Sequence, residues 1–195
     1  MTDMKFERRA AMATLLANRP DNLFVVPGLG SCTWDAFAAG DSDRTFYLWG
    51  AMGGAAMIGL GLALAQPRLR VAVITGDGEM LMGIGSLATI GVQQPPNLSV
   101  VVFDNGLYGE TGRQASHTQS GVDLCAVARG SGIARVLDVA DDAGLRELAG
   151  LLANGDGPLF ARVPITADDP GRALPEKDGV AIKDRVRRAV EQAGL

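Results

Sequence analysis

Two apolar runs separated by a segment of helical length constrain the fold of this chain most strongly. The first run is VAVIT at residues 71–75 and the second is LSVVVF at residues 98–103. Such nearly continuous apolar runs are typical of strands buried on both faces of a parallel sheet. Parallel neighbours need a long crossover, which the intervening residues can supply as a helix. Residues 71–105 therefore predict a strand–helix–strand unit whose two strands end at the same edge of a sheet.

The rest of the chain continues this alternation. Helices are predicted at residues 5–18, 31–39 (with Ser31 as a cap), 50–65, 122–128, 142–153 and 180–192, and strands at 22–26, 45–49, 134–139 and 159–165. The pattern predicts an α/β fold with a doubly wound, mostly parallel sheet and helices on both faces. We expect one domain over residues 1–195, in which 166–195 form a connector and a terminal helix.

Composition argues against several classes of function. The net charge of −4 and the pI near 5.0, with no basic stripe, disfavour nucleic acid as a partner. Cys32 and Cys125 lie far apart and outside any CxxC pair, so no disulfide framework or zinc site is expected. The first residues lack a signal-peptide core, and residues 51–65 are too short and glycine-rich to span a membrane. We expect a cytoplasmic protein with no membrane partner.

Polar residues follow both strands of the central unit. Gly76, Asp77 and Gly78 come after the first strand, and Asn105 comes after the second. Ligands of open α/β sheets bind at this edge, and the start of a helix there favours an anion such as phosphate. A carboxylate beside a phosphate requires a bridging cation, and Mg²⁺ prefers oxygen ligands of this kind. The residues alone therefore predict a site for a metal ion and a diphosphate.

The amino-acid sequence of this region resembles that of a known family. GDGEMLMGIGSLATIG, followed by NLSVVVFDNGLYGETGRQ, is similar to the signature of enzymes that bind thiamine diphosphate. It looks closest to the phosphonopyruvate and sulfopyruvate decarboxylases. The resemblance runs from Leu23 to the terminal residues 173–190, and it covers only the diphosphate-binding (PP) domain of that family.

The resemblance implies a set of binding residues. Mg²⁺ would be held by Asp77, the Asn105 side chain and the Leu107 carbonyl, and the diphosphate by the N–H groups of Gly78 and Glu79. The implied cofactor-binding residues are Gly50, Met52, Gly76, Asp77, Gly78, Glu79, Asn105, Leu107, Tyr108 and Gly109. The Gly50 carbonyl would accept a bond from the aminopyrimidine, and Met52 would support the bent cofactor. The Glu79 side chain is expected to turn away from the anion.

The resemblance also implies that the site is incomplete. In this family, the glutamate that activates the pyrimidine comes from a separate pyrimidine-binding (Pyr) domain, for which this chain has no room. We therefore expect a hetero-oligomer with a Pyr (α) subunit that decarboxylates a small 2-oxo acid. His117, the only histidine, is a candidate proton donor or substrate ligand, and Arg113 and Gln114 are candidates for binding an acidic substrate tail.

Three alternatives remain open at this point. Gly28 and Gly30 form a GxG after a strand, as in nucleotide-binding domains, but Thr33 occupies the place of the third glycine. A thiamine enzyme subunit of this kind can also serve carboligation or the oxidation of a 2-oxo acid. A third possibility is a non-catalytic subunit that has kept the fold.

Overall fold

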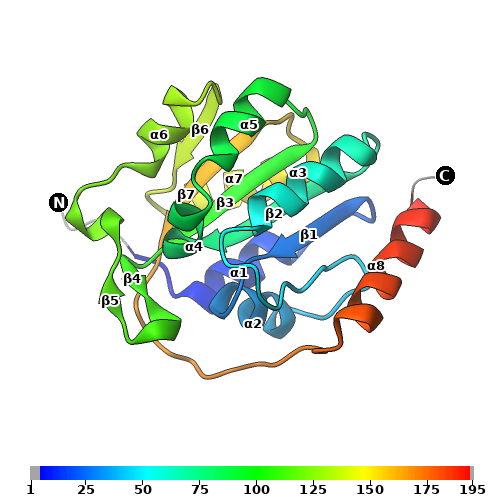
Figure 1. The fold of residues 1–195 in the computed structure, drawn as a ribbon, viewed down its shortest axis with the longest axis horizontal. Coiled ribbons are helices and arrows are strands. Elements are labelled where there is room, and N and C mark those ends of the chain that lie inside the picture. Colours follow the sequence, from blue (N-terminus) through cyan, green and yellow to red (C-terminus); the bar gives the residue numbers. More distant parts are fainter. Residues whose placement is uncertain (1–4, 194–195) are drawn as a thin grey trace.

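A five-stranded parallel sheet forms the centre of the computed structural model, which describes residues 5–193 (Figure 1). Its strands are β1 (Leu23–Pro27), β2 (Arg70–Gly76), β3 (Leu98–Asp104), β6 (Arg135–Asp138) and β7 (Leu159–Pro164). Their order is β1-β2-β3-β7-β6, and every neighbouring pair is parallel. The predicted strand–helix–strand unit at residues 71–105 is confirmed.

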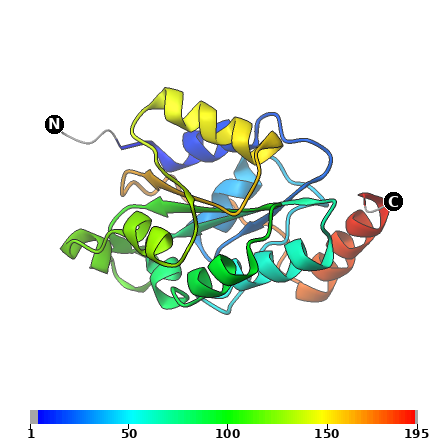
Figure 2. The same cartoon turned by 90° about the horizontal axis from the view of Figure 1, so that it is seen from above.

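Helices cover both faces of the sheet, so the expected doubly wound architecture is confirmed (Figure 2). One face carries α1 (Arg8–Leu16), α2 (Ser31–Ala38) and α7 (Asp142–Asn154). The other carries α3 (Ala55–Ala65), α4 (Asp77–Met82), α5 (Ser86–Gln93) and α6 (Leu124–Gly130). The terminal helix α8 (Gly179–Ala193) packs Val186 and Ala189 against Phe24 beside the edge strand β1. Among residues 5–193, no helix is both long and apolar enough to cross a membrane.

The register of β2 and β3 sets the position of the polar residues that follow these two strands. Gly76 lies opposite Phe103, so the residues that follow each strand leave the sheet at the same edge. The chain after β3 then forms a small hairpin of β4 (Leu107–Tyr108) and β5 (Gln114–Ala115), with 3-10 turns at Gly109–Thr111 and His117–Ser120. The sequence predicted this region only as a polar loop.

The predicted strand at residues 45–49 is wrong. Only Thr45 forms a single bridge, to Val25, and the Phe46 N–H donates to the Val25 carbonyl at 2.9 Å. Tyr47 and Leu48 are buried in the cores on opposite faces of the sheet. The apolar pattern of this segment therefore reflects packing at the edge of β1 and not strand pairing.

The boundaries of two predicted helices are also corrected. Gly50, Ala51 and Gly53 have φ values of 100°, 54° and 92°, so residues 50–54 form a loop and α3 begins only at Ala55. The helix after β2 breaks at Gly83, where an added Cβ would overlap the carbonyl of Gly53. Close packing of the loop on the end of α4 explains both corrections.

The expected cap of α2 is a smaller error. Ser31 is the first residue of that helix, and Gly30, at φ 74°, precedes it as a cap without a side chain. The serine hydroxyl therefore has no capping role.

Two glycines of α3 provide a test of its packing on the sheet. An added Cβ at Gly59 would overlap Cγ2 of Val73 on β2, whereas one at Gly61 would meet no atom within 4 Å. We expect Gly59→Ala to lower the free energy of unfolding by about 1–3 kcal/mol through overpacking. Gly61→Ala, the matched control, should raise it by roughly 0.5–1 kcal/mol because alanine favours the helix. Chemical denaturation of both variants measures the difference, and equal effects would contradict this packing.

Candidate active site

Asp77 and Asn105 meet at the carboxyl edge of the sheet. Asp77, the first residue of α4, is only 2% exposed. Its carboxylate accepts hydrogen bonds from the Ser116 hydroxyl, from the Thr118 hydroxyl at 3.1 Å and from the Asn105 backbone N–H. The structure thus brings Asp77 and Asn105, the two residues that the sequence selected, to one cavity, and it adds two hydroxyls that bind the Asp77 carboxylate.

The backbone carbonyl of Leu107 is the third candidate oxygen ligand. The carbonyls of Gly106 and Tyr108 accept N–H groups of Ser116 and Arg113, at 2.8 and 3.0 Å. Successive carbonyls of an extended chain point in opposite directions, so the Leu107 carbonyl faces away from β5. Its N–H donates to Oδ1 of Asn105 at 2.8 Å, which fixes that side chain beside it.

These groups form an all-oxygen donor set. One carboxylate, one amide oxygen and one backbone carbonyl suit a hard cation such as Mg²⁺. Within residues 5–193, no three His, Cys, Asp or Glu side chains gather in a way that could hold a metal ion. Burial raises the pKa of Asp77, and the nearby charge of Asp104 adds to that shift, while the hydroxyl and amide donors oppose it. A bound cation would favour the ionised form of this carboxyl group.

Gly78 lets the Tyr108 ring pack closely against the start of α4, beside these oxygens. An added Cβ on Gly78 would lie 2.6 Å from two carbons of the Tyr108 ring, so only glycine fits under this side chain. The first N–H groups of α4, which include those of Gly78 and Glu79, have no partner within the helix. Gly76 and Gly109 also line this space. The residues present therefore fit a diphosphate bridged to a cation.

Glu79 is bound by donors of the protein itself. It is 4% exposed and accepts the Thr75 hydroxyl at 2.7 Å, the Leu29 N–H at 2.9 Å and the Gly53 N–H at 3.3 Å. An added Cβ at Gly28 would overlap its carboxylate. Burial raises the pKa of Glu79 and these donors oppose the shift. The first glycine of the GxG pair thus makes room for this carboxylate.

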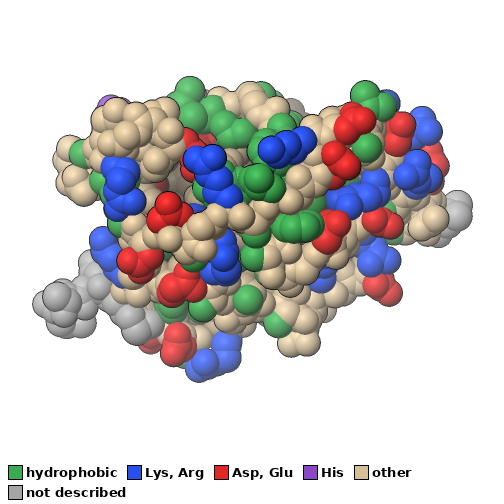
Figure 3. Space-filling view, turned by 90° about the horizontal axis from the view of Figure 1, so that it is seen from below, with side chains coloured by type: hydrophobic (Ala, Val, Ile, Leu, Met, Phe, Trp, Pro, Cys, Tyr) green, Lys and Arg blue, Asp and Glu red, His purple; other side chains and the backbone are tan. Residues whose placement is uncertain are grey.

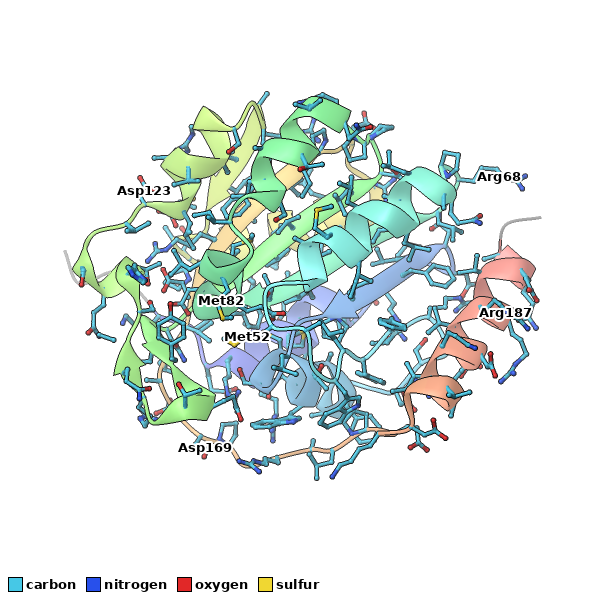
Figure 4. The ribbon with its side chains drawn as sticks, in the orientation of Figure 1. Met52, Arg68, Met82, Asp123, Asp169 and Arg187 are labelled. Carbon is cyan, nitrogen blue, oxygen red and sulfur yellow. The ribbon has the colours of Figure 1, made fainter. Side chains whose placement is uncertain are left out.

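Met52 lies in the loop that packs on the end of α4. Gly53 of this loop is so close to Met82 that an added Cβ would be 3.2 Å from the Met82 Cβ, and Figure 4 shows Met52 and Met82 near each other. Met52 is partly exposed and lines the same cavity as Asp77. Gly50, at φ 100°, belongs to the same loop but does not line the described cavity.

A cavity of about 170 Å³, open to solvent, joins these features. Its wall includes Arg8 from the start of α1, Arg113 from the hairpin and Trp34 from α2. Arg172 of the connector also lines it and stacks on the Trp34 indole, 5.0 Å from the ring centroid. Arg113 has a φ of 62° and donates from Nη2 to the Ala167 carbonyl at 2.9 Å. Basic and acidic side chains gather around a hollow on this side of the molecule (Figure 3).

Two other candidates lie outside the cavity. His117 is exposed, and its Nδ1 lies 3.4 Å from the Tyr108 hydroxyl, which belongs to a residue of the cavity wall. Gln114 is exposed and bonds to Thr111 at 2.9 and 3.0 Å. Any role of His117 in this site therefore has to act through Tyr108 or through a movement of the hairpin.

Sequence reasoning missed several residues of the site. Ser116 and Thr118 hold Asp77 from a turn that the sequence predicted only as a loop. Asp104 binds Arg162 at 2.6 Å from the neighbouring strand. The only sequence signal for Ser116 and Thr118 was their position on either side of His117. The contact between Asp104 and Arg162 depends on the order of the strands, which the sequence did not predict.

Comparison with known proteins identifies the family of this chain. Residues 29–163 match the family model described as "Thiamine pyrophosphate enzyme, C-terminal TPP binding domain". The chain is 37% identical over 190 residues to the sulfopyruvate decarboxylase subunit beta of Methanothermobacter thermautotrophicus, covering 97% of this chain and 98% of that one. It is 44% identical over 163 residues to the phosphonopyruvate decarboxylase of Streptomyces viridochromogenes, covering 81% of this chain but only 39% of that protein.

A solved structure supports the same fold. An X-ray structure assigned as a thiamin diphosphate-dependent enzyme, from Mycobacterium smegmatis, matches with a TM-score of 0.71 at 24% identity. The match covers 84% of this chain and 32% of the other. The family match over residues 29–163 sets aside the nucleotide-binding alternative raised by the GxG pair. The chain belongs to the thiamine pyrophosphate enzymes, as a C-terminal TPP binding domain related to the sulfopyruvate and phosphonopyruvate decarboxylases.

Proposed function

We propose that this chain is the diphosphate- and Mg²⁺-binding subunit of a two-subunit thiamine diphosphate-dependent decarboxylase. Its substrate is a small 2-oxo acid with an anionic tail, similar to sulfopyruvate or phosphonopyruvate. The observation that carries the proposal is the meeting of Asp77, Asn105 and Leu107 beside the first N–H groups of α4. The near end-to-end match to a decarboxylase β subunit supports the same assignment.

In this proposal, the residues of the chain bind and orient the cofactor. Asp77, Asn105 and Leu107 hold Mg²⁺, and the N–H groups of Gly78 and Glu79 hold the diphosphate, with Gly76, Tyr108 and Gly109 as neighbouring walls. The Gly50 carbonyl would accept a hydrogen bond from the amino group of the pyrimidine, and Met52 would contact the cofactor from below the loop at 50–54. When bound, thiamine diphosphate supplies the carbanion stabilisation that decarboxylation requires.

The activating glutamate comes from a partner in this proposal. Glu79 is the buried acid that reaches the 50–55 loop, and it already accepts bonds from Thr75, Leu29 and Gly53. It therefore serves the packing of the loops. A Pyr-type α subunit that docks beside Met52 supplies the missing carboxylate, in keeping with the β-subunit relative.

Arg113 is proposed to bind the anionic tail of the substrate. Its planar guanidinium carries five N–H donors, and one of them bonds to the Ala167 carbonyl. Arg113 also lines the cavity, where the remaining donors could bind an anion. His117 remains the proposed proton donor, and its contact with the Tyr108 hydroxyl supports that role. Decarboxylation followed by protonation releases an aldehyde, whereas carboligation would give a longer hydroxyketone.

Replacement of the proposed metal ligand tests the cofactor site. Asp77→Asn is expected to weaken Mg²⁺-dependent thiamine diphosphate binding by at least about 100-fold, more than is typical for a residue behind the ligands. Because the asparagine also removes a buried charge, the melting temperature of the cofactor-free chain should not fall. Calorimetric titration measures the affinity, with the exposed Asp142→Asn as control. Equal affinities in the two variants would contradict the assignment.

Reconstitution tests the need for a partner. The purified chain alone is expected to show no turnover of sulfopyruvate or phosphonopyruvate, and the chain assembled with its Pyr-type subunit should release carbon dioxide and an aldehyde. Coupled assays for carbon dioxide and chromatography of the products measure both outcomes. Ordinary enzymatic turnover by the single chain would refute the two-subunit proposal, and a carboligation product would refute the reaction.

Removal of the Arg113 charge tests substrate recognition. Loss of a charge-assisted hydrogen bond costs about 1.5–3 kcal/mol, so Arg113→Met should raise the KM for sulfopyruvate or phosphonopyruvate by roughly 10- to 100-fold. The KM for pyruvate, which has no anionic tail, should change little. Arg146→Met, at an exposed position of α7, is the control. A rise in KM of the same size for all three acids would speak against a role in tail binding.

A further inference from the structure

The geometry points to a positioning role for an ion pair behind the metal site. We propose that the pair formed by Asp104 and Arg162 positions the Asp77 carboxylate for its cation. The pair acts through the hydroxyls of Ser116 and Thr118, which hold Asp77 from the hairpin side. The inference rests on the proposed function, because it takes Asp77 to be a metal ligand.

The first step of this connection crosses three strands. Arg162 on β7 lies in register with Asp138 on β6 and with Val102 on β3. Its Nε donates to Oδ2 of Asp104 at 2.6 Å, and its Nη1 donates to Oδ1 of Asp138 at 3.0 Å. The guanidinium is therefore held from two directions, and it fixes one oxygen of a carboxylate that is 4% exposed.

The second step passes from β3 to the turn after the hairpin. Oδ1 of Asp104 accepts the Gly106 N–H at 3.0 Å and the Thr118 hydroxyl at 2.8 Å. One carboxylate oxygen thus holds the chain both before the hairpin and after it. The Ser116 N–H closes the same loop by donating to the Gly106 carbonyl at 2.8 Å.

The third step reaches the metal ligand. Thr118 Oγ1 lies 2.8 Å from the Ser116 hydroxyl and 3.1 Å from Oδ2 of Asp77, and the Ser116 hydroxyl donates to the same oxygen. Thr118 has one hydroxyl proton, which is shared between Asp104 at 2.8 Å and Asp77 at 3.1 Å, so Ser116 is the full donor to Asp77 and Thr118 links the two carboxylates. Groups that orient a metal ligand in this way commonly affect metal affinity 10- to 100-fold.

The charge of Arg162 is what makes this arrangement possible. Asp77 and Asp104 are both buried, and a single hydroxyl, that of Thr118, lies between them. An unpaired carboxylate at position 104 would be costly to bury and would repel the charge of Asp77. Arg162 neutralises Asp104, so the two acids can share Thr118 without separating.

Removal of the arginine charge is the direct test. In the full chain assembled with its partner subunit and saturated with thiamine diphosphate, we expect Arg162→Met to weaken Mg²⁺ binding by about 10- to 100-fold. At saturating Mg²⁺, kcat should stay near that of the unmodified enzyme. Hydrogen exchange of residues 114–121 should accelerate in the cofactor-free chain. Arg135→Met is the matched control, because Arg135 lies on β6 and donates to the Asp156 carbonyl.

Two further variants separate charge from packing. Asp104→Asn combined with Arg162→Met leaves no unpaired charge at position 104 and keeps an oxygen that accepts from Thr118, so it should restore most of the Mg²⁺ affinity. Asp138 also loses its partner in this variant, but its side chain is 56% exposed. Thr118→Val removes only the hydroxyl and should weaken Mg²⁺ binding without lowering the melting temperature. Thr14→Val is its control, because the Thr14 hydroxyl donates to the Ala10 carbonyl within α1, away from the site.

The outcomes distinguish this inference from the proposed function. If the unmodified enzyme binds Mg²⁺ and the Arg162→Met and Thr118→Val variants bind it equally well, the positioning role is refuted and the proposed function stands. If the unmodified enzyme binds no Mg²⁺ with thiamine diphosphate, both are refuted. Weakened binding in both variants, with recovery in the double variant, supports the inference.

Discussion

Three buried carboxylates at the carboxyl edge of the sheet determine how the surrounding loops are arranged. Asp77, Glu79 and Asp104 are each at most 4% exposed, and burial of such charges is costly unless donors surround them. The loops supply those donors. Hydroxyls of the turn after the hairpin bind Asp77, and backbone N–H groups of two other loops bind Glu79. The site is therefore assembled around the need to satisfy buried negative charge.

The same principle separates the roles of these acids. Glu79 is satisfied by neutral donors that belong to the fold, and Asp104 is paired with the positive charge of Arg162. Asp77, like Glu79, has only hydroxyl and amide donors, and burial raises the pKa of both. Asp77 differs from Glu79 in its neighbours, because it is bonded to the backbone of Asn105, whose side-chain oxygen is held by the Leu107 N–H. These neighbouring oxygens support the proposal that Asp77 is a metal ligand.

Local sequence patterns predicted the centre of the molecule well. The runs at residues 71–75 and 98–103 form neighbouring strands, because a continuous apolar run has few alternatives to a buried parallel strand. The segment at 45–49 shows the limit of that logic, since Tyr47 and Leu48 are buried without strand pairing. The loop at 50–54 depends on a close approach to Gly83, which no local pattern encodes. Arg8, Trp34 and Arg172 converge on the cavity from distant segments, so only the tertiary structure could identify them.

Glu79 has a consequence for how the site can adapt. Its carboxylate ties the start of α4 to the loop before α2 and to the loop at 50–55. The segment proposed to hold the diphosphate and the segment proposed to receive the pyrimidine are thus joined by hydrogen bonds to one buried carboxylate. The opposite wall is built differently, since the hairpin and the connector meet through the Arg113 contact with Ala167. Under the proposed function, the wall formed by the hairpin and the connector is the side on which substrate size could vary without moving the loops tied to Glu79.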